Sequence, residues 1–383
     1  MRVLATVTAN ASHTRSLAIA VEPLIRAGHE VVIASSPDLE ALLGPLGVPV
    51  HPVIPSLGPM IGPADRAAVD VFLEAVQADL ATGVHLFAGL PAVSRGTRTL
   101  LELAEQVRPD LIVRDDAEFC ALLVAEHLGI PHVCLPGSFA NLLDPVLGAE
   151  SLSPHWAALG HHEPFAPEAI YRHGRVDYVP AAFDFAAHDT GAVLRYRQPV
   201  LTREGERLPA WIAEASGEKP LIYAALGTRL PPGHAGVVAA IIDAVSEMDC
   251  QALVSIGGLA APAGPLPDHV HLVEQAPQPL VLEAADLFIT HGGYNSLREA
   301  LRSGTPMVVV PGVLDQPHNG ARVAELGLGE GTTTPSAEVL ADLCREVLGG
   351  PSYGRRARQS RAAVLTLPDM AQLVADLEKL ATR

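Results

Sequence analysis

The side chains with the clearest chemical potential lie in the run Thr290–Ser296, which reads Thr-His-Gly-Gly-Tyr-Asn-Ser. The run follows a short apolar segment, Leu287–Thr290, and opens a helical pattern that extends to Arg302. Paired glycines let a backbone approach a ligand closely, and free amides at the start of a helix attract phosphate. The run therefore predicts a phosphate site to which Asn295 and Ser296 add donors, with a simple tight turn as an equal alternative.

A second candidate is His13, which follows the apolar segment Val3–Thr8. Where a hydroxyl is the nucleophile, a base must take its proton at neutral pH, and histidine is the natural choice. A histidine base works best when a carboxylate fixes its tautomer. Asp115 and Asp116 follow the apolar segment Leu111–Val113 and fall on the same edge as His13. A helix cap or a surface position is the alternative for this histidine.

Short apolar runs alternate with longer helical patterns along the chain, which indicates strand-helix-strand units and parallel sheets. The expected strands are Val3–Thr8, Val31–Ala34, Leu111–Val113, His132–Leu135, Leu221–Ala225, Ala252–Ile256, Val270–Val273, Leu287–Thr290 and Met307–Val310. The expected helices include Leu17–Arg26, Ala117–Leu128 and the tail Pro368–Leu380. We therefore predict an α/β protein with two facing, doubly wound (Rossmann-like) parallel-sheet domains. Ligands of such sheets bind at the carboxyl ends of the strands, here in a cleft between the two halves.

The domain boundaries follow from the same alternation. We expect a first domain at 1–200, a second domain at 218–365, and a C-terminal helix at 366–383 that could pack back on the first domain. The charged and Pro-rich stretch Arg195–Lys219 is typical of a linker. Two irregular segments of the first domain, Ser56–Arg108 and Pro136–Ala187, would be its variable, substrate-shaping part.

Composition excludes several classes of partner. The chain has 383 residues and a net charge of -17, which argues against a nucleic-acid partner because such binding needs a lysine- or arginine-rich face. The four cysteines are scattered without metal-binding spacing, and we expect buried thiols. No apolar run is long enough for a membrane helix, and the amino terminus lacks the features of a signal peptide, so we expect a cytoplasmic protein with no membrane partner.

The chain resembles the nucleotide-sugar-dependent glycosyltransferases of the GT-B fold, in particular the inverting family that decorates antibiotics and other natural products. The family signature appears as Gln275-Ala276-Pro277-Gln278, then His291–Ser296, then Glu299, then Asp315-Gln316. The spacing between these blocks also matches, and the resemblance runs over most of the chain. The family usually has an aromatic residue where this chain has Gln275, which leaves the choice between uracil and thymine open.

The resemblance implies that 1–200 is the N-terminal acceptor-binding domain and 218–365 the C-terminal nucleotide-sugar-binding domain, and it implies a role for each matching position. The residues that it assigns to the donor are Gly227, Thr228, Gln275, Gln278, His291, Gly292, Gly293, Asn295, Ser296, Glu299, Asp315 and Gln316. Among them, His291 and the helix start would hold the diphosphate, and Glu299 would accept hydrogen bonds from the ribose. Asp315 would read hydroxyls of the transferred sugar. On the acceptor side the resemblance selects His13 as general base with Asp115 as its orienting partner, and Asp116 is kept in reserve.

The expected function is transfer of a sugar, with a deoxysugar as the favoured choice, from a TDP- or UDP-sugar to a hydroxyl of an apolar natural-product aglycone with inversion. An Asp-x-Asp motif does not stand at a strand end, so we expect neither a metal nor any other cofactor. A nucleotide-sugar epimerase on the same fold and a non-catalytic helper that binds a nucleotide sugar or aglycone are the alternatives. A homodimer is compatible with the sequence, and no motif specifies the aglycone or the sugar.

Overall fold

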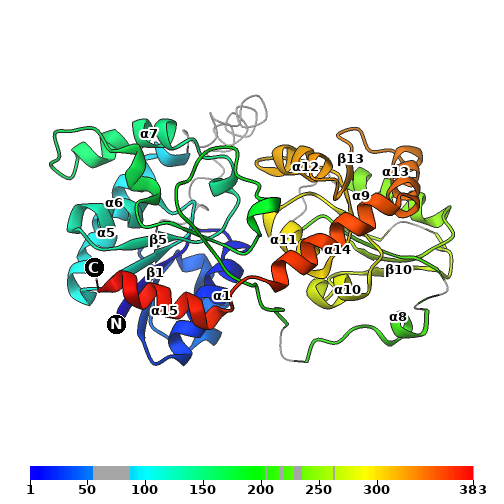
Figure 1. The fold of residues 1–383 in the computed structure, drawn as a ribbon, viewed down its shortest axis with the longest axis horizontal. Helices are drawn as coiled ribbons and strands as arrows, with labels where there is room; N and C mark the ends of the chain where they lie inside the picture. Colours follow the sequence, from blue (N-terminus) through cyan, green and yellow to red (C-terminus); the bar gives the residue numbers. More distant parts are fainter. Residues whose placement is uncertain are drawn as a thin grey trace. The chain divides into compact units, whose positions relative to one another are not determined.

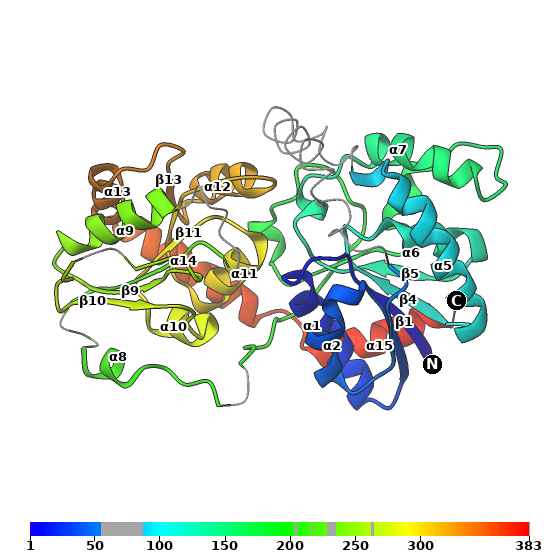
Figure 2. The same ribbon diagram turned by 180° about the vertical axis from the view of Figure 1, so that it is seen from behind.

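The computed structural model describes residues 1–54, 87–202, 205–215, 217, 219–227, 235–261 and 264–382. The chain divides into two compact units (Figures 1 and 2). Unit 1 comprises Met1–Tyr178, Asp184–Gln198 and Leu367–Arg383, and unit 2 comprises Val179–Phe183 and Pro199–Thr366. Thr228 lies outside the described residues, as does a large part of the segment Ser56–Arg108.

Within the described residues, unit 1 is built on a seven-stranded parallel sheet with the order β3-β2-β1-β4-β5-β6-β7. The strands are β1 (Arg2–Thr6), β2 (Glu30–Ala34), β3 (Val50–His51), β4 (Leu111–Arg114), β5 (His132–Cys134), β6 (Arg175–Asp177) and β7 (Val193–Arg195). The longer helices are α1 (His13–Arg26), α5 (Pro91–Val107), α6 (Phe119–Leu128), α7 (Pro145–Ala157) and α15 (Met370–Ala381). The short helices are η1 (Pro37–Leu39), α2 (Glu40–Leu43), η2 (Gly44–Leu46), η4 (Phe139–Asn141) and η5 (Pro167–Tyr171).

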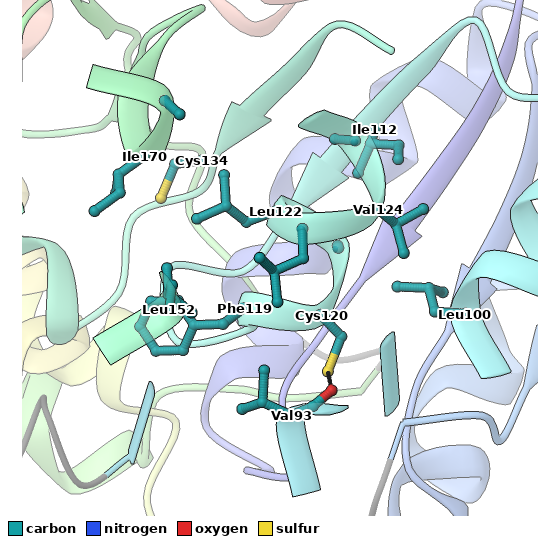
Figure 3. Packing of buried hydrophobic residues seen from close by; sticks show 14 of the residues in the cluster. Val93, Leu100, Ile112, Phe119, Cys120, Leu122, Val124, Cys134, Leu152 and Ile170 are labelled. Atoms are coloured by element: carbon teal, nitrogen blue, oxygen red, sulfur yellow. Dashed lines mark hydrogen bonds between the residues drawn. The ribbon is translucent and has the colours of Figure 1, made fainter. Parts of the chain in front are cut away.

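Helices cover both faces of this sheet, as buried parallel strands require. On one face α5 and α6 pack against β1 and β4, and Leu100, Ile112 and Leu122 are fully buried among them (Figure 3). Helix α6 is apolar around its whole circumference, since seven of its ten residues are buried. Helices α1 and α15 pack against each other on the other side of the sheet (Figure 1). The C-terminal helix is therefore part of unit 1.

Unit 2 repeats the scheme, and its described residues form a six-stranded parallel sheet with the order β10-β9-β8-β11-β12-β13. The strands are β8 (Leu221–Ala225), β9 (Gln251–Ser255), β10 (Val270–Val273), β11 (Leu287–Thr290), β12 (Met307–Val309) and β13 (Gly329–Gly331). The helices are η6 (Ala181–Phe183), α8 (Ala210–Ala215), α9 (Ala235–Ser246), α10 (Gln278–Ala284), α11 (Tyr294–Ser303), α12 (Gln316–Glu325), α13 (Ala337–Gly349) and α14 (Pro351–Leu365). Helices α9 and α13 enclose the apolar core on one face of the sheet.

The six strands of unit 2 have the order 3-2-1-4-5-6, and the first six strands of unit 1 have the same order with β7 added at the edge. This is the strand order of a doubly wound dinucleotide-binding fold. The order reverses between β1 and β4 in unit 1 and between β8 and β11 in unit 2. Loops that leave these neighbouring strands diverge to opposite faces, and the crevice between them is the usual ligand site. The predicted fold class is confirmed, and the sites should lie at these two points.

The structure departs from the predicted elements where strands are short or polar. The strands β3, β6, β7 and β13 were not expected, and each has only two or three residues. The segment Pro136–Ala187 is more regular than predicted, since it contains α7 and β6. The predicted linker also contains a short helix, α8. Across the described part of the chain, no helix combines the length and apolarity that crossing a membrane demands.

Candidate active site

In unit 1 the switch point brings His13 and Asp115 together. His13 is the first residue of α1, which follows β1, and Asp115 directly follows the neighbouring strand β4. The His13 Nδ1 and Asp115 Oδ2 atoms are 2.7 Å apart, and the two residues are only 7% and 3% exposed. A carboxylate can only accept, so Nδ1 carries the proton and Nε2 is the basic nitrogen of the neutral ring. This is the tautomer that a general base needs.

The backbone holds the Asp115 carboxylate in place. Its Oδ1 accepts a hydrogen bond from the backbone amide of Ala117 at 2.9 Å. The backbone amide of Asp115 donates to the carbonyl of Thr6 in β1 at 3.0 Å. The side chain of Glu118 accepts from the first amides of α6 and fixes the same turn. The carboxylate is therefore rigid before any substrate binds, which lowers the cost of orienting the imidazole.

Asp116, the reserve candidate, has different partners. Its Oδ1 lies 3.9 Å from His13 Nδ1, beyond hydrogen-bond distance, while its Oδ2 accepts from the amide of Ala140 at 2.7 Å. Burial, together with the charge of Asp115, raises the pKa of Asp116 to about 7. Of the two aspartates, Asp115 is thus the one bonded to the imidazole.

The same three residues have a spacing that a cation would also accept. One ligand atom from each of His13, Asp115 and Asp116 lies within 4.8 Å of the others. A cation bound there would take Nδ1 away from Asp115, because that nitrogen cannot donate a proton and bind a metal at once. The base and the metal site are therefore mutually exclusive, and a chelator distinguishes them.

At the switch point of unit 2 lies the segment Thr290–Gly293, between β11 and α11, which we call the glycine loop. The side chain of His291 lies against two glycines there. Gly293 is the N-cap of α11, and a Cβ added to it would lie 2.4 Å from His291 Nε2. Gly227, which follows β8, has φ 98°, and its Cβ would lie 3.2 Å from the same nitrogen. Gly292 has φ 83°, a left-handed conformation that glycine adopts without strain. The absence of side chains at Gly227 and Gly293 thus leaves room for His291 beside the first amides of α11, an arrangement that suits an anion.

Three of the residues predicted to bind the nucleotide-sugar donor form a hydrogen-bonded cluster on α10 and α11. Gln278 Nε2 donates to Glu299 Oε2 at 2.7 Å and lies 3.3 Å from Ser296 Oγ. Glu299 is 3% exposed, and one carboxylate oxygen is oriented by the amide of Gln278. A carboxylate held in this way can accept hydrogen bonds from a vicinal diol such as a ribose. Asn295 accepts a hydrogen bond from Arg298, one turn further along the helix.

Asp315 and Gln316 stand at the start of α12, where they support the glycine loop. The Asp315 Oδ2 atom accepts a hydrogen bond from Asn319 Nδ2 at 2.6 Å. The same Asn319 amide donates to the carbonyl of Gly292 at 2.8 Å. Gln316 Oε1 accepts from the amides of Gly312 and Val313, which leaves its Nε2 as a donor.

The structure thus gathers most of the donor candidates around the glycine loop and α11. Gln275 is exposed in the loop before α10, outside the cluster formed by Gln278, Ser296 and Glu299. Sequence reasoning missed Asn319 and Arg298. A signal for both existed, because Asn319 lies four residues after Asp315 and Arg298 three residues after Asn295, spacings that place side chains on one helix face.

Known proteins resemble the chain over its whole length. Residues 239–380 match the family model described as the C-terminal domain of erythromycin biosynthesis protein CIII-like proteins. The elloramycin glycosyltransferase of Streptomyces olivaceus is 28% identical over 392 residues, which cover 98% of this chain and 97% of the relative. The TDP-daunosamine transferase of Streptomyces peucetius is 24% identical, over 100% and 97% of the two chains. Among solved structures, glycosyltransferase VinC in complex with dTDP superposes with a TM-score of 0.76 at 24% identity, over 100% of both chains.

Proposed function

We propose the following reaction for the chain, an antibiotic-type glycosyltransferase with the GT-B fold whose residues 239–380 match the family model of the C-terminal domain of erythromycin biosynthesis protein CIII-like proteins. It transfers a sugar, favouring a deoxysugar, from a thymidine or uridine diphosphate donor to a hydroxyl of an apolar natural-product aglycone. Unit 2 holds the donor, and unit 1 holds the acceptor.

The observation that carries the proposal is the buried hydrogen bond between His13 and Asp115 at the switch point of unit 1. His13 Nε2 takes the proton of the acceptor hydroxyl while the hydroxyl oxygen forms a bond to the anomeric carbon. The bond from that carbon to the diphosphate oxygen breaks, and its electron pair leaves with the nucleoside diphosphate. Asp115 stabilises the imidazolium that forms. A single displacement of this kind inverts the anomeric centre.

The donor assignment rests on unit 2. His291, with the first amides of α11, would stabilise the charge that develops on the leaving diphosphate, and Glu299 would bind the ribose. One relative is named for a TDP-sugar and one similar structure contains dTDP, which supports a thymidine nucleotide.

We expect transfer to proceed without a divalent metal, because His291 and the first amides of α11 would stabilise the charge on the leaving diphosphate. Purified protein treated with EDTA should keep its turnover. Turnover that is lost with EDTA and restored by Mg²⁺ or Mn²⁺ would show that His13, Asp115 and Asp116 bind a cation and do not act as base and partner.

The decisive experiment substitutes His13 by Ala and follows product mass with a panel of TDP- and UDP-sugars and apolar aglycones. We expect transfer to decrease by roughly 10² to 10⁴, the usual contribution of a general base. His29→Ala is a matched control, because His29 also pairs with a carboxylate, Glu378 at 3.1 Å, but at the opposite edge of the same sheet. Full turnover in His13→Ala would refute the base, and an isomerised sugar formed without acceptor would identify an epimerase.

A further inference from the structure

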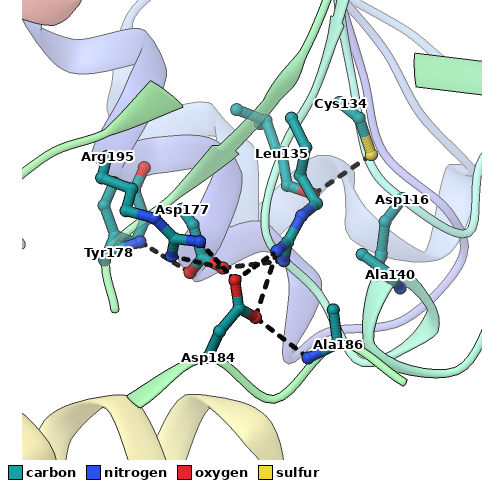
Figure 4. A network of polar contacts seen from close by, with 10 residues as sticks. Asp116, Cys134, Leu135, Ala140, Asp177, Tyr178, Asp184, Ala186 and Arg195 are labelled. Atoms are coloured by element: carbon teal, nitrogen blue, oxygen red, sulfur yellow. Dashed lines mark hydrogen bonds and ion pairs between the residues drawn. The ribbon is translucent and has the colours of Figure 1, made fainter. Parts of the chain in front are cut away.

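The buried carboxyl group of Asp116 connects the base to the loop that follows β5. Asp116 is 1% exposed, and its Oδ2 accepts a hydrogen bond from the backbone amide of Ala140 at 2.7 Å (Figure 4). Its Oδ1 lies 3.9 Å from His13 Nδ1 and has no hydrogen-bond partner among the described residues. One carboxyl group thus contacts the acceptor-side loop with one oxygen and faces the imidazole with the other.

Gly137, in the loop after β5, lies directly against the carboxyl group of Asp116. A Cβ added to Gly137 would lie 2.0 Å from Asp116 Oδ1 and 2.5 Å from its Cγ. The backbone of Gly137 is not in the left-handed region, so any residue could adopt its conformation. The carboxyl group of Asp116 is therefore the obstacle that makes glycine necessary here.

The loop from Gly137 to Ala140, which contacts Asp116, is itself part of the segment Pro136–Ala187 that is predicted to shape the substrate site. Phe139 packs against Phe87 and Phe119, with ring centroids 5.1 and 6.5 Å apart. The carbonyl of Asn141 accepts a hydrogen bond from the amide of Ala187 at 2.8 Å. A shift of the loop at residues 137–140 would therefore move several side chains of the segment Pro136–Ala187 relative to His13.

We propose that Asp116 and Gly137 form a positioning pair, which fixes the loop Pro136–Asn141 beside His13 and so sets where the acceptor hydroxyl lies relative to Nε2. This role rests on the proposed function, since it concerns the acceptor of that reaction. Asp116 does not touch the reacting atoms, and it acts through Ala140 and the loop. The pair therefore affects binding of the acceptor and leaves binding of the donor unchanged.

A double-mutant cycle tests the pair. Gly137→Ala should raise the acceptor KM strongly, because the new methyl group collides with the carboxyl group and displaces the loop. Asp116→Ala should raise it less, because only the bond to Ala140 is lost. In the double variant the space left by Asp116 admits the methyl group, so the two changes should be coupled by roughly tenfold in kcat/KM for the acceptor.

Three further measurements separate positioning from a general loss of structure. Asp116→Asn keeps an oxygen for the Ala140 amide and should recover most of the acceptor affinity that Asp116→Ala loses. The affinity for dTDP, measured by calorimetry, should stay at the wild-type value in all variants. Gly44→Ala, at a glycine of unit 1 where no described atom lies within 4 Å of an added methyl group, should leave the acceptor KM unchanged. Additive effects, or an increase in donor KM in place of acceptor KM, would overturn the proposal.

A readout without substrate separates the positioning pair from the proposed reaction. The imidazole NMR signals of His13 report the loop position in the unliganded protein. They should move in Gly137→Ala and return toward their wild-type positions in the double variant. If the wild-type protein transfers no sugar, the proposed function fails, whereas unchanged His13 signals in Gly137→Ala would refute the positioning pair alone.

Discussion

Two aspartates that are adjacent in the sequence differ in their hydrogen bonds, and this difference separates the roles proposed for them. Asp115 is held by backbone amides and bonds to His13, while Asp116 bonds to the Ala140 amide and faces the imidazole across 3.9 Å. An ionised Asp115 alone is enough to stabilise an imidazolium. A second charged carboxylate in the same buried space would be unfavourable, which agrees with the raised pKa of Asp116.

Substitution of Asp115 by Asn should lower kcat by roughly 10² or more, because the amide cannot stabilise the imidazolium as a carboxylate does. The acceptor KM should change much less, since the side chain keeps its shape. Steady-state kinetics with saturating donor measures both. Asp110→Asn is the matched control, because Asp110 bonds to the Arg2 amide at the amino edge of the same sheet. Equal kcat in the two variants would contradict the role of Asp115.

Asp116 also predicts how stability depends on pH. Its pKa is about 7 in the folded chain against 3.8 ordinarily, so the folded state binds more protons than the unfolded state between these values. The contribution of this group to stability is full below about pH 4 and is lost as the pH rises through about 7. The amide of Asp116→Asn does not titrate. The free energy of unfolding of this variant, measured with urea, should therefore rise relative to that of wild type from pH 5 to pH 8. Parallel pH profiles would show that Asp116 is ionised throughout.

At the scale of elements, the sequence predicts whatever is long, apolar and periodic. The strands β8, β10 and β11 have the predicted bounds, and α11 starts within the predicted glycine motif. Strand β6 could not be predicted from the sequence because two of its three residues are charged. Both are fully buried, and Arg175 pairs with Asp177 at 2.7 Å and with Asp184. The contact of Gly137 with Asp116 is equally unpredictable, since no local pattern links the two positions.

The close contact at the start of helix α11 can be tested by substituting Gly293. Gly293→Ala would place a methyl group 2.4 Å from His291 Nε2, so either the imidazole or the helix start must shift. Because a hydrogen bond to a charged group contributes about 1.5–3 kcal/mol, we expect affinity for dTDP to fall by roughly 10- to 100-fold. Isothermal calorimetry measures the change. Gly236→Ala, where no described atom of the same unit crowds the added Cβ, is the control, and an unchanged affinity in Gly293→Ala would place the diphosphate elsewhere.

At the scale of the whole molecule, unit 2 interrupts unit 1. The chain leaves unit 1 after Gln198 and returns at Leu367, so that α15 completes the unit in which the chain began. His29 joins the two ends of unit 1, since it lies 3.4 Å from the Met1 amino group and 3.1 Å from Glu378 of α15. The Tyr196 hydroxyl adds a bond to Asp376 at 2.9 Å.

The role of α15 can be measured with one core substitution. Leu377 is fully buried in unit 1, and Leu377→Ala should lower the unfolding free energy of that unit by about 2–5 kcal/mol. The chain has two tryptophans, Trp156 in unit 1 and Trp211 in unit 2, so single-tryptophan variants follow each unit separately during urea unfolding. Lys379→Ala, on the exposed side of the same helix, should have little effect. A shift in the Trp211 transition alone would mean that α15 stabilises the other unit.

The interrupted chain has a consequence for engineering. Apart from the short segment Val179–Phe183, unit 2 is the continuous stretch 199–366, which is flanked on both sides by unit 1. If unit 2 holds the donor as proposed, donor preference should be exchanged between relatives by grafting this stretch with α15 left behind. A chimera that simply joins one amino-terminal half to another carboxyl-terminal half would combine α15 with a foreign α1. The separate segment Val179–Phe183 should be exchanged together with this stretch, because the guanidinium of Arg356 in α14 stacks on the Phe183 ring at 4.4 Å.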